Sequence, residues 1–197
     1  MIKKIYFFIL VLILNLNLNT LYASDIKEFE LEGMSVGDSL LDFFSKQQIK
    51  NFYPVEYPGS KRIVGWETDE SIQFELFSAM TFHVKKDDKN YEILSIKAML
   101  NIDKKEECFK KKKDLIFNIK KNFNFENEYS YEDNYGNSVG DSIAYLTDFD
   151  MKDGGSIRVW CSVWDKNHEQ SKYWEDDLSL SASSVEFLDF LQKEAYK

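Results

Sequence analysis

Residues that interrupt or loosen a chain are scarce in this sequence. Only 2 prolines and 8 glycines occur among its 197 residues. Flexible linkers between domains are usually rich in glycine, serine or proline, so the composition argues against domains joined by long linkers. A chain of this length can bury the core of one ordinary domain.

Positive charge is also in deficit. The sequence has 25 Lys and Arg against 34 Asp and Glu, which gives a formal net charge of -9. Domains that bind nucleic acid usually present a basic surface, so we expect no nucleic-acid partner. One basic run, residues 110–113, departs from this pattern. We interpret it as the solvated side of a helix, and a docking site for acidic groups is the alternative.

Catalytic and cofactor-binding motifs of fixed spacing are absent. The sequence contains no G-x-S-x-G, H-E-x-x-H, P-loop or G-x-G-x-x-G pattern, and His83 and His168 lie outside any such motif. Residues 148–154 resemble a calcium-binding loop, but Lys152 occupies the place of the third acidic ligand. We therefore predict that the protein is not an enzyme and has no cofactor or metal site. A catalytic site built from residues distant in sequence is the alternative.

An apolar run stands close to the N-terminus. Lys3 and Lys4 precede the apolar residues 5–14, and the small residue Ala23 follows, an order typical of a secretory signal peptide. The run is shorter than the roughly 20 apolar residues that span a bilayer. We expect cleavage after residue 23, which leaves a single domain of residues 24–197 with 23 basic and 34 acidic residues, a net charge of -11. No cysteine lies near this point, so we expect a periplasmic or secreted protein without a stable membrane anchor; an uncleaved anchor or a buried helix is the alternative.

The sequence has only 2 cysteines, Cys108 and Cys161. An exported chain meets an oxidising compartment, where such cysteines are expected to pair. In residues 104–122 the apolar residues recur with the period of a helix, and Cys108 lies on the same stripe as Ile119. In residues 157–164 they alternate as in a strand, and Cys161 lies on the apolar face. Both periodicities place the sulfur atoms in one core and predict a disulfide between a helix and a strand.

Alternating patterns predict an antiparallel sheet of hairpins. One hairpin joins residues 74–84 to 94–102, and a second joins 143–149 to 157–164. A further strand is expected at residues 178–182. Capping boxes and apolar periodicity predict three helices, which begin at Ser35, at Lys104 and at Ser183. Residues 124–137 are polar and aromatic, and we interpret them as a loop or irregular edge. The predicted fold is α+β: an antiparallel sheet packed against about three helices and closed by one disulfide.

The candidate binding residues are Arg158, Trp160 and Trp164. They alternate with the face that carries Cys161 and therefore share the opposite face of the strand. Exposed aromatic rings beside an arginine can stack on a sugar, a base or the side chains of a partner. In the alternative interpretation, a helix covers this face and both tryptophans belong to the core.

Two parts of the chain resemble a family of exported proteins. Residues 29–45 (FELEGMSVGDSLLDFFS) and the C-terminal segments 161–165, 177–181 and 184–196 are similar to small exported proteins of AT-rich marine bacteria of the Pelagibacter type. The resemblance implies export and a single α+β domain, and it implies no activity and no catalytic residues. A weaker likeness, at residues 33–35 (GMS), is to small lipoproteins of the outer-membrane assembly machinery. This chain lacks their lipidated cysteine.

Three functions are compatible with these patterns. The first is a non-catalytic periplasmic or secreted protein that binds an unknown protein or small-molecule ligand. The second is a factor for envelope assembly or maintenance. The third is a hydrolase of envelope polymers, which would need His83 or His168 in a pocket with a carboxylate in reach.

Overall fold

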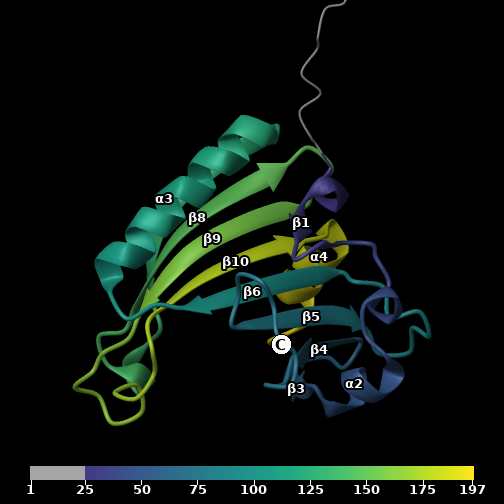
Figure 1. Ribbon diagram of the computed structural model, residues 1–197, viewed down its shortest axis with the longest axis horizontal. Helices are drawn as coiled ribbons and strands as arrows, with labels where there is room; N and C mark the ends of the chain where they lie inside the picture. The colour runs from purple at the N-terminus through teal and green to yellow at the C-terminus, as the bar shows by residue number, and fades with distance from the viewer. Residues whose placement is uncertain (1–24) are drawn as a thin grey trace, which may run out of the picture.

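The computed structural model describes residues 25–197, and the predicted signal peptide, residues 1–23, lies outside the described residues. An antiparallel sheet of 8 strands dominates the fold, in the order β3-β4-β5-β6-β10-β9-β8-β7 (Figure 1). Its strands are β3 (Tyr53–Val55), β4 (Ile63–Glu67), β5 (Ala79–Lys85), β6 (Ser95–Asn101), β7 (Phe125–Asn134), β8 (Ile143–Met151), β9 (Ser156–Val163) and β10 (Asp177–Ser183). A second sheet of 2 strands pairs β1 (Glu30–Leu31) with β2 (Met34–Ser35).

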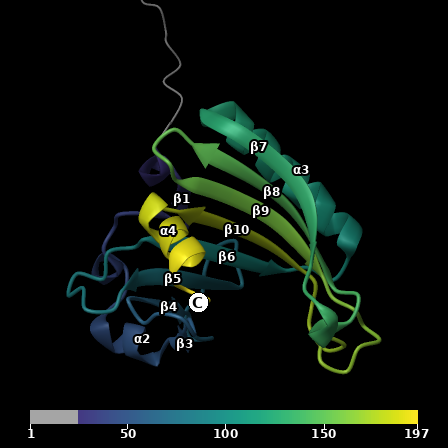
Figure 2. The same cartoon turned by 180° about the vertical axis from the view of Figure 1, so that it is seen from behind.

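Helices lie on both faces of the large sheet. The α-helices are α2 (Lys46–Asn51), α3 (Lys105–Asn122) and α4 (Val185–Lys193), and the 3-10 turns are η1 (Ile26–Glu28), η2 (Leu40–Asp42) and η3 (Asn137–Val139). Figures 1 and 2 show α3 on one face and α4 on the other, and we name the faces after these helices. The predicted α+β class, with an antiparallel sheet of hairpins, about three helices and one disulfide, is confirmed.

Both predicted hairpins are present, and β10 joins them. β5 pairs with β6, and β8 pairs with β9. β10 lies between β6 and β9, so that Ser181 stands opposite Lys97 on one side and opposite Arg158 on the other. Side chains from two hairpins that are distant in sequence therefore come together on the α4 face.

The main core lies on the α3 face. It is built from the inward side chains of the central strands, among them Phe82, Ile96, Val159, Cys161 and Leu180. The N-terminal segment and α2 extend the same core. The ring centroid of Phe44 lies 5.6 Å from that of Phe82 and 5.3 Å from that of Phe52. Apolar burial on this face provides the main stabilisation of the sheet.

The predicted disulfide is confirmed. Cys108 of α3 and Cys161 of β9 are bonded, their Cα atoms are 6.0 Å apart, and both residues are completely buried. The bond fixes α3 to the centre of the sheet. It closes a loop of 53 residues, which stabilises the fold by about 4 kcal/mol in the chain-entropy model.

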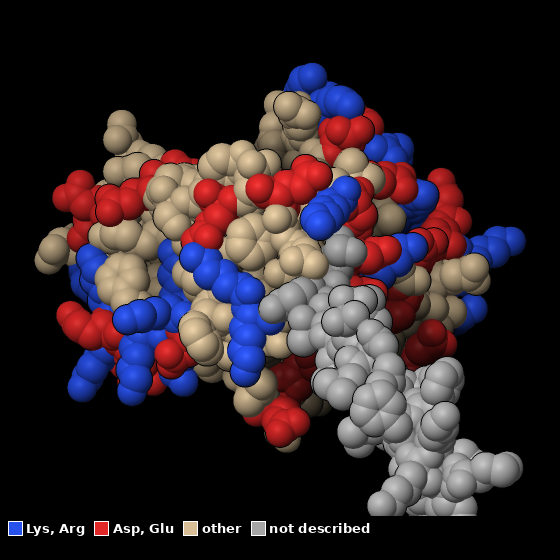
Figure 3. Space-filling model, turned by 90° about the horizontal axis from the view of Figure 1, so that it is seen from above, with Lys and Arg blue, Asp and Glu red and all other residues tan. Residues whose placement is uncertain are grey.

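The basic run 110–113 is only partly a solvated surface. Lys110, Lys111 and Lys113 are exposed, as expected, and Figure 3 shows basic side chains gathered on the side of the molecule where α3 lies. Lys112 is buried, and its Nζ donates a hydrogen bond to the carbonyl oxygen of Tyr145 in β8 at 2.6 Å. Burial lowers the pKa of Lys112 to about 8.

The helix predicted to begin at Ser35 is wrong. Asp38 accepts a hydrogen bond from the backbone N–H of Ser35, as in half of a capping box, but Gly37 has a left-handed φ of +95°. The backbone N–H groups of Gly37 and Leu40 donate to carbonyl groups at residues 91–93 instead of to a helix. Tertiary hydrogen bonds have therefore replaced helical ones. The first helix is the short α2, which begins at a complete capping box of Ser45 and Gln48.

Residues 125–134, predicted as a loop or irregular edge, form an edge strand and not a loop. β7 runs for 10 residues along β8 and forms the edge of the sheet, with one bulge between Phe125 and Asn127. All of its residues after Phe125 are exposed. A strand that is exposed on both faces lacks the alternation of polar and apolar residues on which strand prediction depends.

Candidate functional site

α4 leaves a cavity between itself and the sheet. The cavity has a volume of about 360 Å³. Its floor is formed by side chains of four strands, namely His83, Ser95, Lys97, Arg158, Trp160 and Ser181. Its roof is formed by Phe187, Leu188 and Leu191 of α4. We call this space the α4 cavity.

The orientation of α4 depends on its first residue. The expected cap was Ser183, but the helix begins one residue later, where Ser184 accepts a hydrogen bond from the N–H of Phe187 at 3.3 Å. This start turns Phe187 and Phe190 towards the sheet and leaves Val185 52% exposed. The aromatic side of α4 therefore faces the cavity.

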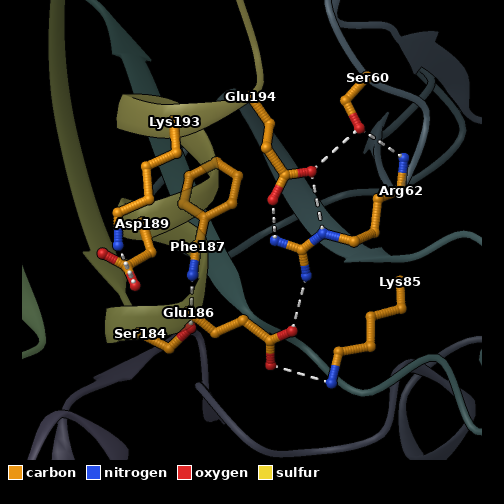
Figure 4. Close-up of polar contacts among 9 residues, drawn as sticks. All are labelled: Ser60, Arg62, Lys85, Ser184, Glu186, Phe187, Asp189, Lys193 and Glu194. Atoms are coloured by element: carbon orange, nitrogen blue, oxygen red, sulfur yellow. Dashed lines mark hydrogen bonds and ion pairs between the residues drawn. The ribbon is translucent and has the colours of Figure 1, made fainter.

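Ion pairs fix α4 to the strands beneath it (Figure 4). Arg62 Nη1 lies 2.9 Å from Glu186 Oε1, and Arg62 Nη2 lies 2.9 Å from Glu194 Oε1, so one guanidinium joins both ends of the helix. Lys85 of β5 adds a second ion pair to Glu186 at 2.9 Å. The hydrogen bonds of Arg62 lower the pKa of Glu194. These contacts set the height of the cavity roof.

His83 and Tyr57 close one end of the α4 cavity. The Tyr57 hydroxyl lies 2.9 Å from His83 Nε2, and the imidazole stacks on Phe187 with 4.4 Å between centroids. Gly65 of β4 makes room for this ring, because a Cβ atom there would lie 3.1 Å from His83 Cδ2 and Nε2. The Cδ2–Nε2 edge of His83 thus faces β4.

Both closing residues are neutral at pH 7. Burial lowers the pKa of His83 to about 3, with a further contribution from the charge of Lys97, and burial raises the pKa of Tyr57. Either atom can donate the hydrogen bond between the Tyr57 hydroxyl and His83 Nε2, because the direction depends on which imidazole nitrogen carries the proton. His83 Nδ1 is buried and has no hydrogen-bond partner in the described part of the chain.

The floor of the α4 cavity carries positive charge without a lining carboxylate. Lys97 Nζ lies 5.3 Å from the centroid of the Trp160 ring and forms no ion pair with any described residue. Arg158 is paired outside the cavity: its Nε and Nη2 donate to the two carboxylate oxygens of Asp148, each at 2.7 Å. The hydrogen bonds to Asp148 raise the pKa of Arg158. Lys97 is therefore the unpaired cation of this site.

Trp164 belongs to a separate aromatic cluster. Its ring stacks on Tyr135 at 4.5 Å and meets Trp174 edge to face at 4.7 Å. Asp176 accepts the backbone N–H of Trp164 at 3.0 Å. Of the three candidate binding residues, the fold brings Arg158 and Trp160 together in the α4 cavity and places Trp164 beyond the end of β9, outside its lining. The alternative interpretation, in which a helix covers this face, holds in part: Trp160 lies under α4 and is half-buried. It still lines the cavity.

Sequence reasoning missed several residues of this site. Lys97 and Ser95 share the α4 face of β6, which their alternation already indicates. The sequence has no local signal that β6 lies near β9. The proximity of Lys97 to Trp160 therefore could not be predicted. Tyr57, the partner of His83, lies outside the helices and strands, so no periodicity indicates where its side chain points.

In residues 25–197, no group of three or more His, Cys, Asp and Glu could hold a metal ion. His168 lies in a loop, where its Nδ1 accepts the N–H of Gln170 at 3.3 Å. No helix in this part of the chain has the length and hydropathy needed to cross a membrane.

Comparisons with known proteins assign no family. The chain matches no protein-family model, no curated protein and no solved structure. The functional interpretation therefore depends on the geometry of the α4 cavity alone.

Proposed function

We propose that this protein is an exported, non-catalytic binding protein and that a small ligand occupies the α4 cavity. The observation that carries the proposal is an unpaired cation in the lining: Lys97 forms no ion pair with any described residue, and the lining holds no carboxylate. A ligand with a hydrogen-bond acceptor supplies the partner that Lys97 lacks. Trp160 offers such a ligand an aromatic wall.

Export is part of this proposal. The N-terminal sequence pattern supports it, and so does the bond between Cys108 and Cys161, because disulfides persist in oxidising compartments such as the periplasm and the extracellular space. We therefore expect the protein in the periplasmic or secreted fraction.

Native mass spectrometry of the protein from its own envelope fraction tests the proposal. We expect the wild-type chain, and a Trp174→Ala control variant in the separate aromatic cluster, to retain a small molecule. Trp160→Ala should lose it while keeping the disulfide and the fold. A wild-type protein without any additional mass, in spectra recorded directly from the extract, would contradict the proposal.

The two other functions stay predictions. The lining of the α4 cavity includes His83 but no carboxylate, so this cavity offers the hydrolase hypothesis no acid–base pair. An envelope assembly factor should co-purify with outer-membrane components. Normal envelope permeability in a deletion strain would count against that role.

A further inference from the structure

The α4 cavity holds a cation that lacks an anionic partner. Lys97 brings three N–H donors, forms no ion pair with any described residue, and no carboxylate lines the cavity. Ser95 Oγ and Ser183 Oγ lie 2.8 Å apart, so their shared hydrogen bond uses one of two hydroxyl protons. The second hydroxyl proton has no acceptor among residues 25–197. A negatively charged ligand group that accepts hydrogen bonds matches this lining.

These donors lie close together on the sheet. Ser183 of β10 stands directly opposite Ser95 of β6. Lys97 is two residues from Ser95 on β6 and so points to the same face. Diagonal neighbours of this kind are within reach of one small group.

The opposite wall of the cavity is apolar. Phe187, Leu188 and Leu191 of α4 form the roof, and the indole of Trp160 bounds the floor. The volume of about 360 Å³ holds roughly a dozen atoms of the size of a water oxygen, at about 30 Å³ each. The site therefore has a polar, donor-rich floor and an apolar roof at a separation that suits a small amphiphilic molecule.

We infer that the ligand of the α4 cavity is a small organic carboxylate with an apolar body, whose carboxylate group binds Lys97. A carboxylate accepts hydrogen bonds and donates none, and its negative charge can pair with the positive charge of Lys97. A neutral sugar would leave the charge of Lys97 without a partner, and a metal cation would need carboxylates, which the lining lacks. The inference rests on the proposed function, because it names the ligand class of the same cavity.

A matched pair of probes tests the role of charge. Phenylacetate and phenylacetamide have nearly the same shape, but only the first is an anion at pH 7. We expect phenylacetate to shift the indole N–H resonance of Trp160 in an NMR titration, and phenylacetamide to bind at least about tenfold more weakly, since a lost charge-assisted hydrogen bond costs about 1.4 kcal/mol or more.

A matched pair of variants tests the role of Lys97. Lys97→Met keeps the length of the side chain and removes its charge, and we expect it to weaken phenylacetate binding at least about tenfold. Lys110→Met makes the same change of net charge on exposed α3, on the other side of the sheet, and should leave the affinity unchanged. Thermal unfolding of each variant checks that the fold is intact.

The outcomes separate this inference from the proposed function. If both probes bind equally well at Trp160, or if Lys97→Met binds phenylacetate as the wild type does, the cavity binds ligands but not through a carboxylate, and only the inference fails. If neither probe shifts Trp160 and native spectra show no retained molecule, the inference and the proposed function fail together.

Discussion

The imidazole of His83 lies against the ring of Phe187, with 4.4 Å between the ring centroids and 29° between the planes. His83 comes from β5 and Phe187 from the first turn of α4, so the contact joins the sheet to the helix and closes one end of the α4 cavity. Burial keeps the ring uncharged at pH 7. A proton added to this ring would have to be desolvated beneath an aromatic roof.

Mild acid should therefore destabilise the protein through His83. Burial, and secondly Lys97, lowers its pKa from 6.5 to about 3 in the folded state. The unfolded chain binds this proton between the two values and the folded chain does not, so the free energy of unfolding is greatest above about pH 6.5. It should fall with decreasing pH by up to about 1.4 kcal/mol per pH unit. Urea unfolding at several pH values between about 7 and 5 measures this slope.

His83→Gln is the control for this slope. It has no titrating group at the position, so the loss of stability between about pH 6.5 and 5 should be smaller than in the wild type. Equal slopes in both proteins would show that His83 titrates normally in the fold.

Alkaline pH should stabilise the protein through Lys112. Burial lowers the pKa of this lysine from 10.5 to about 8. The unfolded chain holds the proton more tightly between these values, so the free energy of unfolding should rise as pH increases above about 8. We expect Lys112→Met to remove the rise, and Lys110→Met, an exposed neighbour on α3, to retain it. Denaturant titrations at about pH 7.5 and 9.5 distinguish the two; the same rise in Lys112→Met would refute the assignment.

Reduction of the disulfide between Cys108 and Cys161 should weaken the whole fold. The loop of 53 residues predicts a loss of about 4 kcal/mol in the free energy of unfolding. The double variant Cys108→Ala, Cys161→Ala should show a similar loss without reductant. Equilibrium unfolding with and without dithiothreitol measures the effect, and the double variant should be insensitive to the reagent. Unchanged stability after complete reduction would argue against the role of this bond as a link between α3 and β9.

Loss of Arg62 should loosen α4 and leave the rest of the sheet intact. Arg62→Met removes the contacts with both Glu186 and Glu194, so we expect faster amide hydrogen exchange in α4 and unchanged exchange in α3. Lys193→Met is the matched control, because its ion pair with Asp189 lies within α4 itself. Hydrogen-exchange mass spectrometry compares the variants. Equal exchange of α4 in both would mean that Arg62 does not hold the cavity roof.

Local sequence patterns predicted much of the scaffold. Alternation predicted both hairpins, and the helical period of residues 104–122 predicted α3. The same patterns placed Cys108 and Cys161 in one core, and the disulfide confirms this. These predictions hold because an apolar stripe must be buried whatever the rest of the fold does. The pattern failed at residues 35–44, where hydrogen bonds to residues 91–93 outweigh the local tendency to form a helix.

Alternation within each strand is therefore enough to place Trp160 and Arg158 on the face opposite Cys161, and Lys97 on the same face as Ser95. Which strands are neighbours, by contrast, is set by the tertiary structure. By placing β10 between β6 and β9, it brought Lys97 and Trp160 into one cavity, and by laying α4 across them it left that cavity with a roof. Periodicity is a property of a few consecutive residues, whereas strand order and helix docking depend on burial summed over the whole chain.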